Sequence, residues 1–176
     1  MPEPGDGRLR KGERRRRALL EATMRLVGRR GTAAVTQRAV AAEAGVPPSA
    51  VLYYFATVDD LLVAALTDVN DDYVARLAAI ATVEDLVGLI EDCARQDRLR
   101  TVAEYELLLH AARRDELRAE LHRWDTALAG AAQRLVPGDP EVRSLLVAAA
   151  NGLFLAAALG SPCDTAALAR LVCRTG

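Results

Sequence analysis

The sequence lacks the signals that mark several large classes of protein. Its 176 residues include three cysteines, Cys93, Cys163 and Cys173, none in a C-x-x-C or Cys/His spacing. This argues against a disulfide framework or a zinc site, and we interpret the thiols as buried or idle rather than redox-sensing. No apolar segment follows the basic N-terminus, and the longest apolar run, 145–159, is shorter than the ~18 residues of a membrane span. We expect a cytoplasmic protein with no membrane contact, metal or cofactor.

Motifs of the common enzyme classes are also missing. The chain contains no G-x-S-x-G, no glycine-rich phosphate loop and no H-E-x-x-H. The carboxylates of "VEDLVGLIEDCARQD" (83–97) are typical of a solvated helix surface rather than a catalytic pair. We predict that the protein is not an enzyme, and a helical enzyme stays as a remote alternative.

Strand signals are equally scarce. Aromatic residues make up 4% of the chain, and no run of alternating β-branched residues lies between turn signals. Ala, Leu, Arg and Glu, which enter helices at little cost, dominate instead. The expected fold is therefore all-α. Apolar periodicity and turn residues predict helices at about 9–29, 37–44, 47–55, 57–79, 83–96, 98–112, 114–135, 140–159 and 164–174.

The charge is unevenly distributed. The net charge is −1, but residues 1–55 carry +6 and the remainder carries −7. A basic head on an acidic body indicates a polyanionic partner for the head alone. The arginines of "RLRKGERRRR" (8–17) supply most of that charge.

The two short helices predicted within 37–55 have helix-turn-helix spacing. Ala41 is small where the helices cross, Gly45 permits a left-handed turn, and Val46 fills the corner. A miniature core is expected beneath them, formed by Val40, Ala44 and Val51. "LYYF" and a helix capped by Thr57 follow directly.

The segment "VTQRAVAAEAGVPPSAVLYYFATVDDLLVAAL" (35–66) combines these features. It resembles the DNA-binding domain of the TetR family of bacterial transcription regulators. The resemblance covers about residues 10–66. The rest is similar to the family's regulatory domain in length and helical character, and 103–124 is similar to one subset of such domains. We expect a leader at 1–7, a three-helix helix-turn-helix domain at 8–56, and a ligand-binding and dimerisation domain at 57–176.

The resemblance implies a set of contacts to double-stranded operator DNA. Arg38 is expected to read guanine and Gln37 adenine, while Thr36 binds phosphate. The run of arginines at 14–17 is expected to attract the negatively charged DNA backbone. Where many family members carry tyrosine and lysine, this chain has Leu52 and Val58, which predicts fewer phosphate contacts. The predicted DNA-binding residues are Arg14, Arg15, Arg16, Arg17, Thr36, Gln37, Arg38, Pro48, Ser49, Ala50, Tyr53 and Tyr54.

The resemblance also implies a small-molecule effector and a homodimer, with control by a protein partner as the alternative. On an apolar helical stripe Trp124 is more often plain core than a pocket wall, and His110 is first read as a surface or hydrogen-bonded core residue. Asn151 could pair across a dimer axis, within the core, or with a ligand. The small residues of 140–159 could equally pack within one protomer. The predicted pocket residues are Tyr105, His110, Trp124 and Asn151, and the predicted dimer residues are Leu145, Ala148, Ala149, Gly152, Ala156, Leu168 and Leu171.

Overall fold

A computed structural model describes residues 6–95, 98–114 and 117–173 of the chain, and this part is helical throughout apart from short connections. The elements are α1 (Asp6–Arg30), a 3-10 turn η1 (Thr32–Ala34), α2 (Gln37–Glu43), α3 (Pro48–Tyr54), α4 (Val58–Ala79), α5 (Val83–Arg95), α6 (Arg98–Ala111), α7 (Arg118–Leu135), α8 (Pro140–Leu159) and α9 (Ala166–Cys173). The all-α expectation is confirmed.

Two helix starts differ from the sequence-based expectation. α1 begins at Asp6, so the end of the predicted leader is helical, while residues 1–5 lie outside the described part. α7 begins at Arg118 rather than near 114, because the amides of Arg114 and Leu117 bond to carbonyls three residues back and tighten the chain into a turn. Leu117, just before the helix, still faces the core.

The helix-turn-helix forms as its spacing predicts. Gly45 has a φ of +65°, and the amide of Val46 bonds to the carbonyl of Ala41 at 2.9 Å. Beneath the turn, Val40 and Val51 are fully buried and Ala44 packs against them. Two α1 arginines fasten α2 in place: Arg25 lies 2.7 Å and Arg29 3.4 Å from carboxylate oxygens of Glu43.

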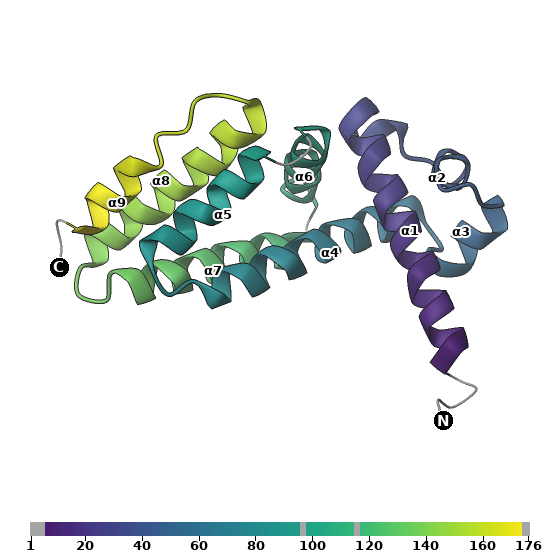
Figure 1. The fold of residues 1–176 in the computed structure, drawn as a ribbon. Coiled ribbons are helices and arrows are strands. Elements are labelled where there is room, and N and C mark those ends of the chain that lie inside the picture. The colour runs from purple at the N-terminus through teal and green to yellow at the C-terminus, as the bar shows by residue number, and fades with distance from the viewer. Residues whose placement is uncertain (1–5, 96–97, 115–116, 174–176) are drawn as a thin grey trace.

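α4 connects this unit to a bundle formed by the remaining helices (Figure 1). Thr57 and Asp60 form a reciprocal capping box at its start, with bonds of 2.9 and 3.0 Å between side chains and backbone amides. In the bundle, α4 packs on α7, and α8 packs on α5, α6, α7 and α9. The N-terminal unit thus sits at one end of a long helix whose other end lies in the bundle.

α6 touches both parts of the molecule. It lies between α1 and the other helices of the bundle (Figure 1). Gly28 of α1 approaches the backbone of Leu99 so closely that a Cβ there would stand 2.2 Å from the Leu99 carbonyl oxygen. Seven residues further along α6, the Glu106 carboxylate accepts a hydrogen bond of 3.3 Å from the amide of Thr32. α6 is therefore held against both α1 and the connection to α2.

Gly28→Ala should destabilise the protein although alanine favours helix by about 1 kcal/mol, since its methyl group would collide with the Leu99 carbonyl. Gly88→Ala on α5 is the matched control, because nothing lies within 4 Å of a Cβ there, and it should raise the melting temperature. Thermal unfolding followed by circular dichroism measures both. Equal stabilisation by the two substitutions would contradict the close approach of α1 and α6.

Candidate DNA-binding surface and ligand cavity

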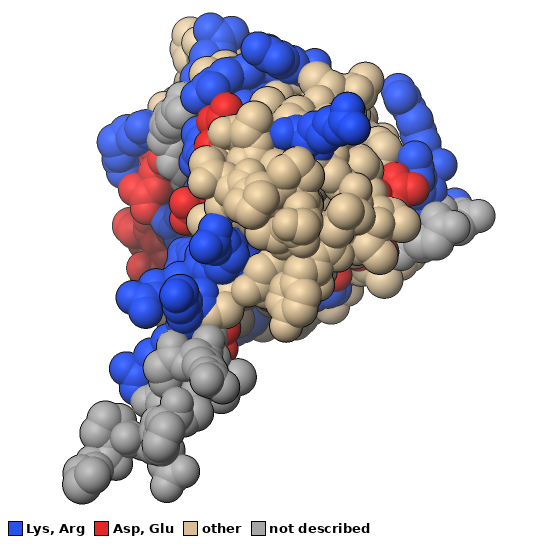
Figure 2. Space-filling view, turned by 90° about the vertical axis from the view of Figure 1, so that its right-hand side faces the viewer, with Lys and Arg blue, Asp and Glu red and all other residues tan. Residues whose placement is uncertain are grey.

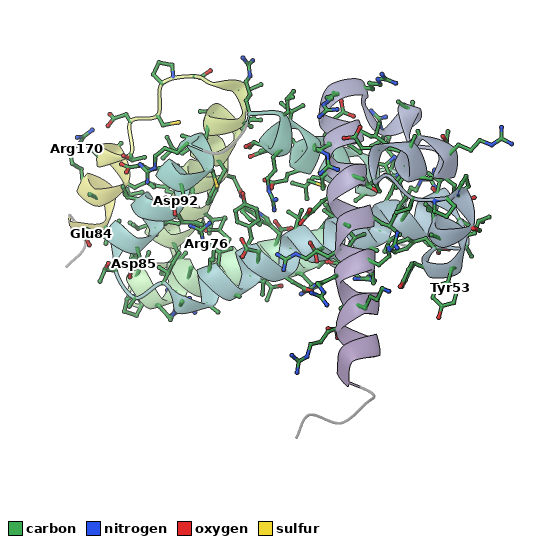
Figure 3. The ribbon with its side chains drawn as sticks, turned by 45° about the vertical axis from the view of Figure 1, so that its right-hand side comes forward. Tyr53, Arg76, Glu84, Asp85, Asp92 and Arg170 are labelled. Atoms are coloured by element: carbon green, nitrogen blue, oxygen red, sulfur yellow. The ribbon has the colours of Figure 1, made fainter. Side chains whose placement is uncertain are left out.

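The outer face of α2 and α3 is largely uncharged, with Lys and Arg gathered around its edges (Figure 2). Arg38 and Ser49 are exposed, and Tyr53 is 82% exposed and points away from the body of the protein (Figure 3). Phe55 faces the core. A smooth, uncharged face with a cationic rim can approach bases while its edges attract phosphates.

Other residues predicted on this face have partners within the protein. The Gln37 amide group donates to the carbonyls of Phe55 and Ala56 at 3.3 and 3.0 Å, which ties α2 to the end of α3. Thr36 accepts a hydrogen bond from the Ala39 amide at 3.1 Å and so caps α2. Sequence reasoning assigned Gln37 to base recognition and missed its bonds to the α3–α4 connection.

The arginines of 14–17 do not form a single face. Successive residues in a helix are turned by about 100°, so four in a row point in different directions. The Arg16 guanidinium lies 5.6 Å from the centre of the Phe55 ring, at the α3 side of α1. Arg17 instead approaches Glu21 at 3.8 Å, on the exposed surface. The run therefore surrounds α1 with positive charge instead of directing it at one partner.

Tyr54 and Ala50 are half-buried rather than exposed. Tyr54 packs edge-on against Tyr53, with ring centres 4.9 Å apart, and its hydroxyl lies beside Gly12 of α1. The second turn of α1 thus lies next to the end of α3. Pro48 is exposed and occupies the first turn of α3, as the sequence predicts.

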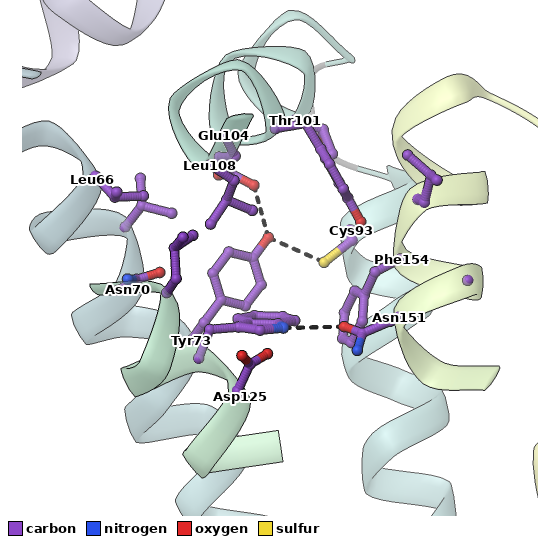
Figure 4. Close-up of a pocket in the computed structure, with 16 residues that line it drawn as sticks. Leu66, Asn70, Tyr73, Cys93, Thr101, Glu104, Leu108, Asp125, Asn151 and Phe154 are labelled. Atoms are coloured by element: carbon purple, nitrogen blue, oxygen red, sulfur yellow. Dashed lines mark hydrogen bonds between the residues drawn. The ribbon is translucent and has the colours of Figure 1, made fainter. Parts of the chain in front are cut away.

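A cavity of about 510 Å³ opens between helices of the bundle, within the size range of small-molecule sites (Figure 4). Residues of α4, α5, α6, α7 and α8 line it. They are Leu66, Val69, Asn70, Tyr73, Cys93, Thr101, Glu104, Tyr105, Leu108, Leu121, Trp124, Asp125, Asn151, Gly152, Phe154 and Leu155.

Three of the four predicted pocket residues, Tyr105, Trp124 and Asn151, line this cavity, and His110 does not. Asn151 accepts a hydrogen bond of 3.1 Å from the Trp124 indole nitrogen, which is the within-core pairing considered for it. His110 is wrong as a pocket residue because it lies five residues after Tyr105, about 140° around α6. Burial lowers the pKa of His110, and the nearby Arg114 acts in the same direction.

Sequence reasoning missed the polar centre of the cavity. The Tyr73 hydroxyl donates to Glu104 Oε2 at 3.0 Å and lies 3.1 Å from the Cys93 sulphur. Glu104 is 5% exposed, and the guanidinium of Arg100 reaches its other oxygen at 3.2 Å. Thr101, Glu104, Tyr105 and Leu108 follow i, i+3, i+4, i+7 spacing, a helical-face signal that could have identified Glu104.

Burial dominates the acid–base behaviour of this centre. It raises the pKa of Glu104, while the Tyr73 hydrogen bond and Arg100 act in the opposite direction. Burial also raises the pKa of Cys93, which keeps this thiol protonated, and raises that of Tyr105 to about 12. The described residues contain no group of three or more His, Cys, Asp or Glu placed to hold a metal ion.

One face of α8 carries apolar side chains out to the surface. Leu145 is 58% exposed, and Ala148, Gly152, Leu155 and Leu159 are exposed with it. These residues are spaced alternately three and four apart, the pattern of a helix that packs along a partner helix. Of the other predicted dimer residues, Ala149, Ala156 and Leu171 are partly buried. Leu168 is wrong as an interface residue, because it is 1% exposed and packs in the protomer's own core.

By length and composition alone, α8 is long and apolar enough to cross a membrane, as are α3 and α4 if read as one span despite a 68° bend. Only 28% of the most apolar stretch of α8 is buried within the chain. Its buried side packs on four other helices. The apolar face described above belongs to the unburied remainder.

Glu104→Gln should raise the melting temperature at neutral pH. Folding raises the pKa of the Glu104 carboxyl, because burial disfavours its ionised form. The folded protein therefore loses stability as the pH rises through that pKa. Glutamine carries no charge, so the difference between variant and wild type should grow from near zero at about pH 4.5 towards pH 8. Thermal unfolding across this range measures it, and a difference that shrinks with rising pH would contradict the assignment.

Comparisons with known proteins agree with these features. Residues 19–65 match the family model described as "Bacterial regulatory proteins, tetR family", and residues 78–175 match that described as "Tetracyclin repressor-like, C-terminal domain". The transcriptional regulator BetI of Rhizobium meliloti is 37% identical over 109 residues, which cover 58% of this chain and 54% of that protein. BetI of Brucella anthropi is 30% identical over 169 residues, which cover 88% of this chain and 87% of that protein.

A solved structure points the same way. That of the multidrug binding protein EbrR complexed with malachite green has a TM-score of 0.72 and 33% identity, and covers 91% of this chain and 96% of that chain. The first match covers the helix-turn-helix unit, and the second covers the cavity-lining residues of α5, α6, α7 and α8. The chain belongs to the TetR family of bacterial transcription regulators and is a ligand-responsive, DNA-binding protein.

Proposed function

We propose that this regulator acts in the cytoplasm as a homodimeric repressor, and that a small molecule in the bundle cavity releases it from a palindromic operator. The observation that carries the proposal is the position of α6, which lines the cavity with one face and contacts α1 with the other. A ligand that shifts α6 therefore acts directly on the helix that supports the DNA-binding unit.

The occupant of the cavity is proposed to be an organic small molecule rather than a protein partner. The cavity is lined mainly by apolar and aromatic side chains from five helices, with a few polar groups among them. The similar EbrR structure is a complex with malachite green, an organic dye. No enzymatic activity is proposed, because the relatives are transcription regulators.

In this proposal Arg38 reads a base edge, Ser49 and Pro48 approach bases from the start of α3, and Tyr53 contacts phosphate. The exposure of all four side chains supports these roles. Gln37 acts mainly by holding α2 on the end of α3 through its two backbone bonds. The arginines around α1 supply sequence-independent attraction.

The exposed face of α8 is proposed to be the centre of the dimer interface. Pairing two copies of this face, flanked by α9, removes Leu145, Leu155 and Leu159 from water. A dimer places two recognition helices about 34 Å apart, one turn of DNA, so that both enter the major groove on the same side.

Arg38→Ala should weaken binding to DNA from upstream of the coding sequence by about 1–3 kcal/mol and relax its selectivity, because one base contact is lost. Binding is measured by fluorescence anisotropy across a salt series. Arg113→Ala, at an exposed arginine two residues beyond the end of α6, is the control and should bind like wild type. An Arg38 variant with wild-type affinity and selectivity would remove this residue from the recognition surface.

Leu145→Arg should convert the dimer to monomer and weaken operator binding with it. Each copy loses a buried leucine worth about 1.5–3 kcal/mol, so the dimer dissociation constant should rise at least about 100-fold. Sedimentation velocity measures the oligomeric state. Leu109→Arg on α6, equally apolar and exposed, should leave the dimer intact; dissociation by both variants, or by neither, would place the interface elsewhere.

A further inference from the structure

The cavity lining has a one-sided charge. Among the described residues that line it, two are acids, Glu104 and Asp125, and none is Lys, Arg or His. This is unusual in a chain with 23 basic residues, several of which lie on α6 and α7 themselves. An anionic ligand would meet two carboxylates and no cationic side chain within the lining.

Three aromatic rings form part of the wall. Trp124 lies edge-to-face with Tyr73 and with Phe154, at ring-centre distances of 5.4 and 5.3 Å. The hydrogen bond from its indole nitrogen to Asn151 holds the ring in place (Figure 4). Electron-rich faces of Trp and Tyr attract cations, most strongly where water is excluded. The wall therefore suits a flat or bulky apolar body that carries positive charge.

Glu104 is incompletely neutralised. Its side chain is 7% exposed, while that of its ion-pair partner Arg100 is 50% exposed and lies outside the cavity lining. An ion pair with a solvent-exposed arginine offsets only part of the free-energy cost of removing a carboxylate from water. A cation inside the cavity would supply the missing charge.

Arg100 also lies beside acidic residues outside the cavity. It borders a surface depression together with Asp68 and Asp72 of α4 and with Arg16 and Glu13 of α1. If a ligand takes over Glu104, the arginine can turn towards these aspartates at the boundary between α1 and α4. Such an exchange of partners would connect the cavity to the DNA-binding unit.

The hydroxyl of Thr101 is a further polar group in the cavity, and it has no hydrogen-bond partner among the described residues. Thr101 is 3% exposed, and its hydroxyl makes no hydrogen bond within the described structure. It lies one turn from Glu104 on the same face of α6 (Figure 4). Buried hydroxyls are rarely left unpaired, so this atom is available to a polar group of a ligand.

We infer that the cavity binds a lipophilic organic cation, and that Glu104 is the residue that selects its charge. The inference deepens the proposed function and rests on the cavity being the effector site. Aromatic rings hold the apolar body, Glu104 replaces Arg100 with the ligand as its counter-ion, and Asp125 adds negative potential.

The test uses the only tryptophan of the chain, Trp124, as a reporter in the cavity wall. The full-length protein is titrated with tetraphenylphosphonium and with tetraphenylborate, which have the same shape and opposite charge. Saturable quenching by the phosphonium at a concentration at least about tenfold lower than any quenching by the borate is expected. Equal or tighter binding of the borate would overturn the inference.

Two variants assign the selectivity to Glu104. Glu104→Gln keeps an acceptor for Tyr73 and should weaken phosphonium binding at least about tenfold. Arg100→Gln removes the competing partner and should strengthen it several-fold. Glu84→Gln, an exposed carboxylate on α5, is the matched control and should change nothing. Wild-type affinity in both the Glu104 and Arg100 variants would overturn the assignment.

Operator binding, measured in the same samples, separates this inference from the proposed function. Phosphonium binding that depends on Glu104 but leaves DNA affinity unchanged would support the cation site and count against its role as effector site. Release from DNA by an uncharged compound that quenches Trp124, with no response to the phosphonium, would support the proposed function and overturn the cation site.

Discussion

The contact between α1 and α6 is the constraint on which the rest of the molecule depends. At Gly28 no side chain separates the two helices, so the Leu99 backbone rests directly against α1. Such a contact has little give, because packed backbone cannot yield as a flexible side chain does. A displacement of α6 must move α1 or break the contact. The DNA-binding unit and the bundle are mechanically coupled at this point.

The two faces of α6 explain how one helix serves both parts. Leu99 and Glu106, seven residues apart, meet α1 and η1, whereas Thr101, Glu104, Tyr105 and Leu108 point roughly 180° away into the cavity. The same geometry puts His110 on the α1 side. Glu104 and Glu106 therefore lie on opposite faces of α6. A change in the partner of Glu104 on the cavity side would reach η1 only by moving the helix that carries both residues.

The cavity and the apolar face of α8 both carry a cost in the isolated chain. Buried Glu104 has a raised pKa, and exposed leucines on α8 remain in contact with water. Neither arrangement is explained by the stability of one protomer, and functional sites are commonly kept at such expense. The proposed cationic ligand would relieve the first cost, and the proposed second protomer would relieve the second. Asn151 shows how closely the two regions adjoin, since it holds Trp124 from the helix that bears the apolar face.

Local signals in the sequence determined the fold class, most helix boundaries and the helix-turn-helix. Gly45, Val46 and the capping pair Thr57 and Asp60 act within a few residues of one another, so their roles follow from spacing and backbone chemistry alone. The start of α7 was less predictable, because the turn before it depends on bonds formed by residues whose helical propensity is ordinary.

The site depended on contacts that only the tertiary structure decided. From the sequence alone Gln37 is predicted to contact a base. In the folded chain its amide group instead bonds to the carbonyls of Phe55 and Ala56, which lie 18 and 19 residues further along the chain. Leu168 reads as interface until the bundle buries it. The partners of Glu104 come from α4 as well as α6, and no periodicity within one helix reports which faces of different helices will meet. Local chemistry determined the elements of this protein, and packing between distant segments decided which polar groups share a cavity.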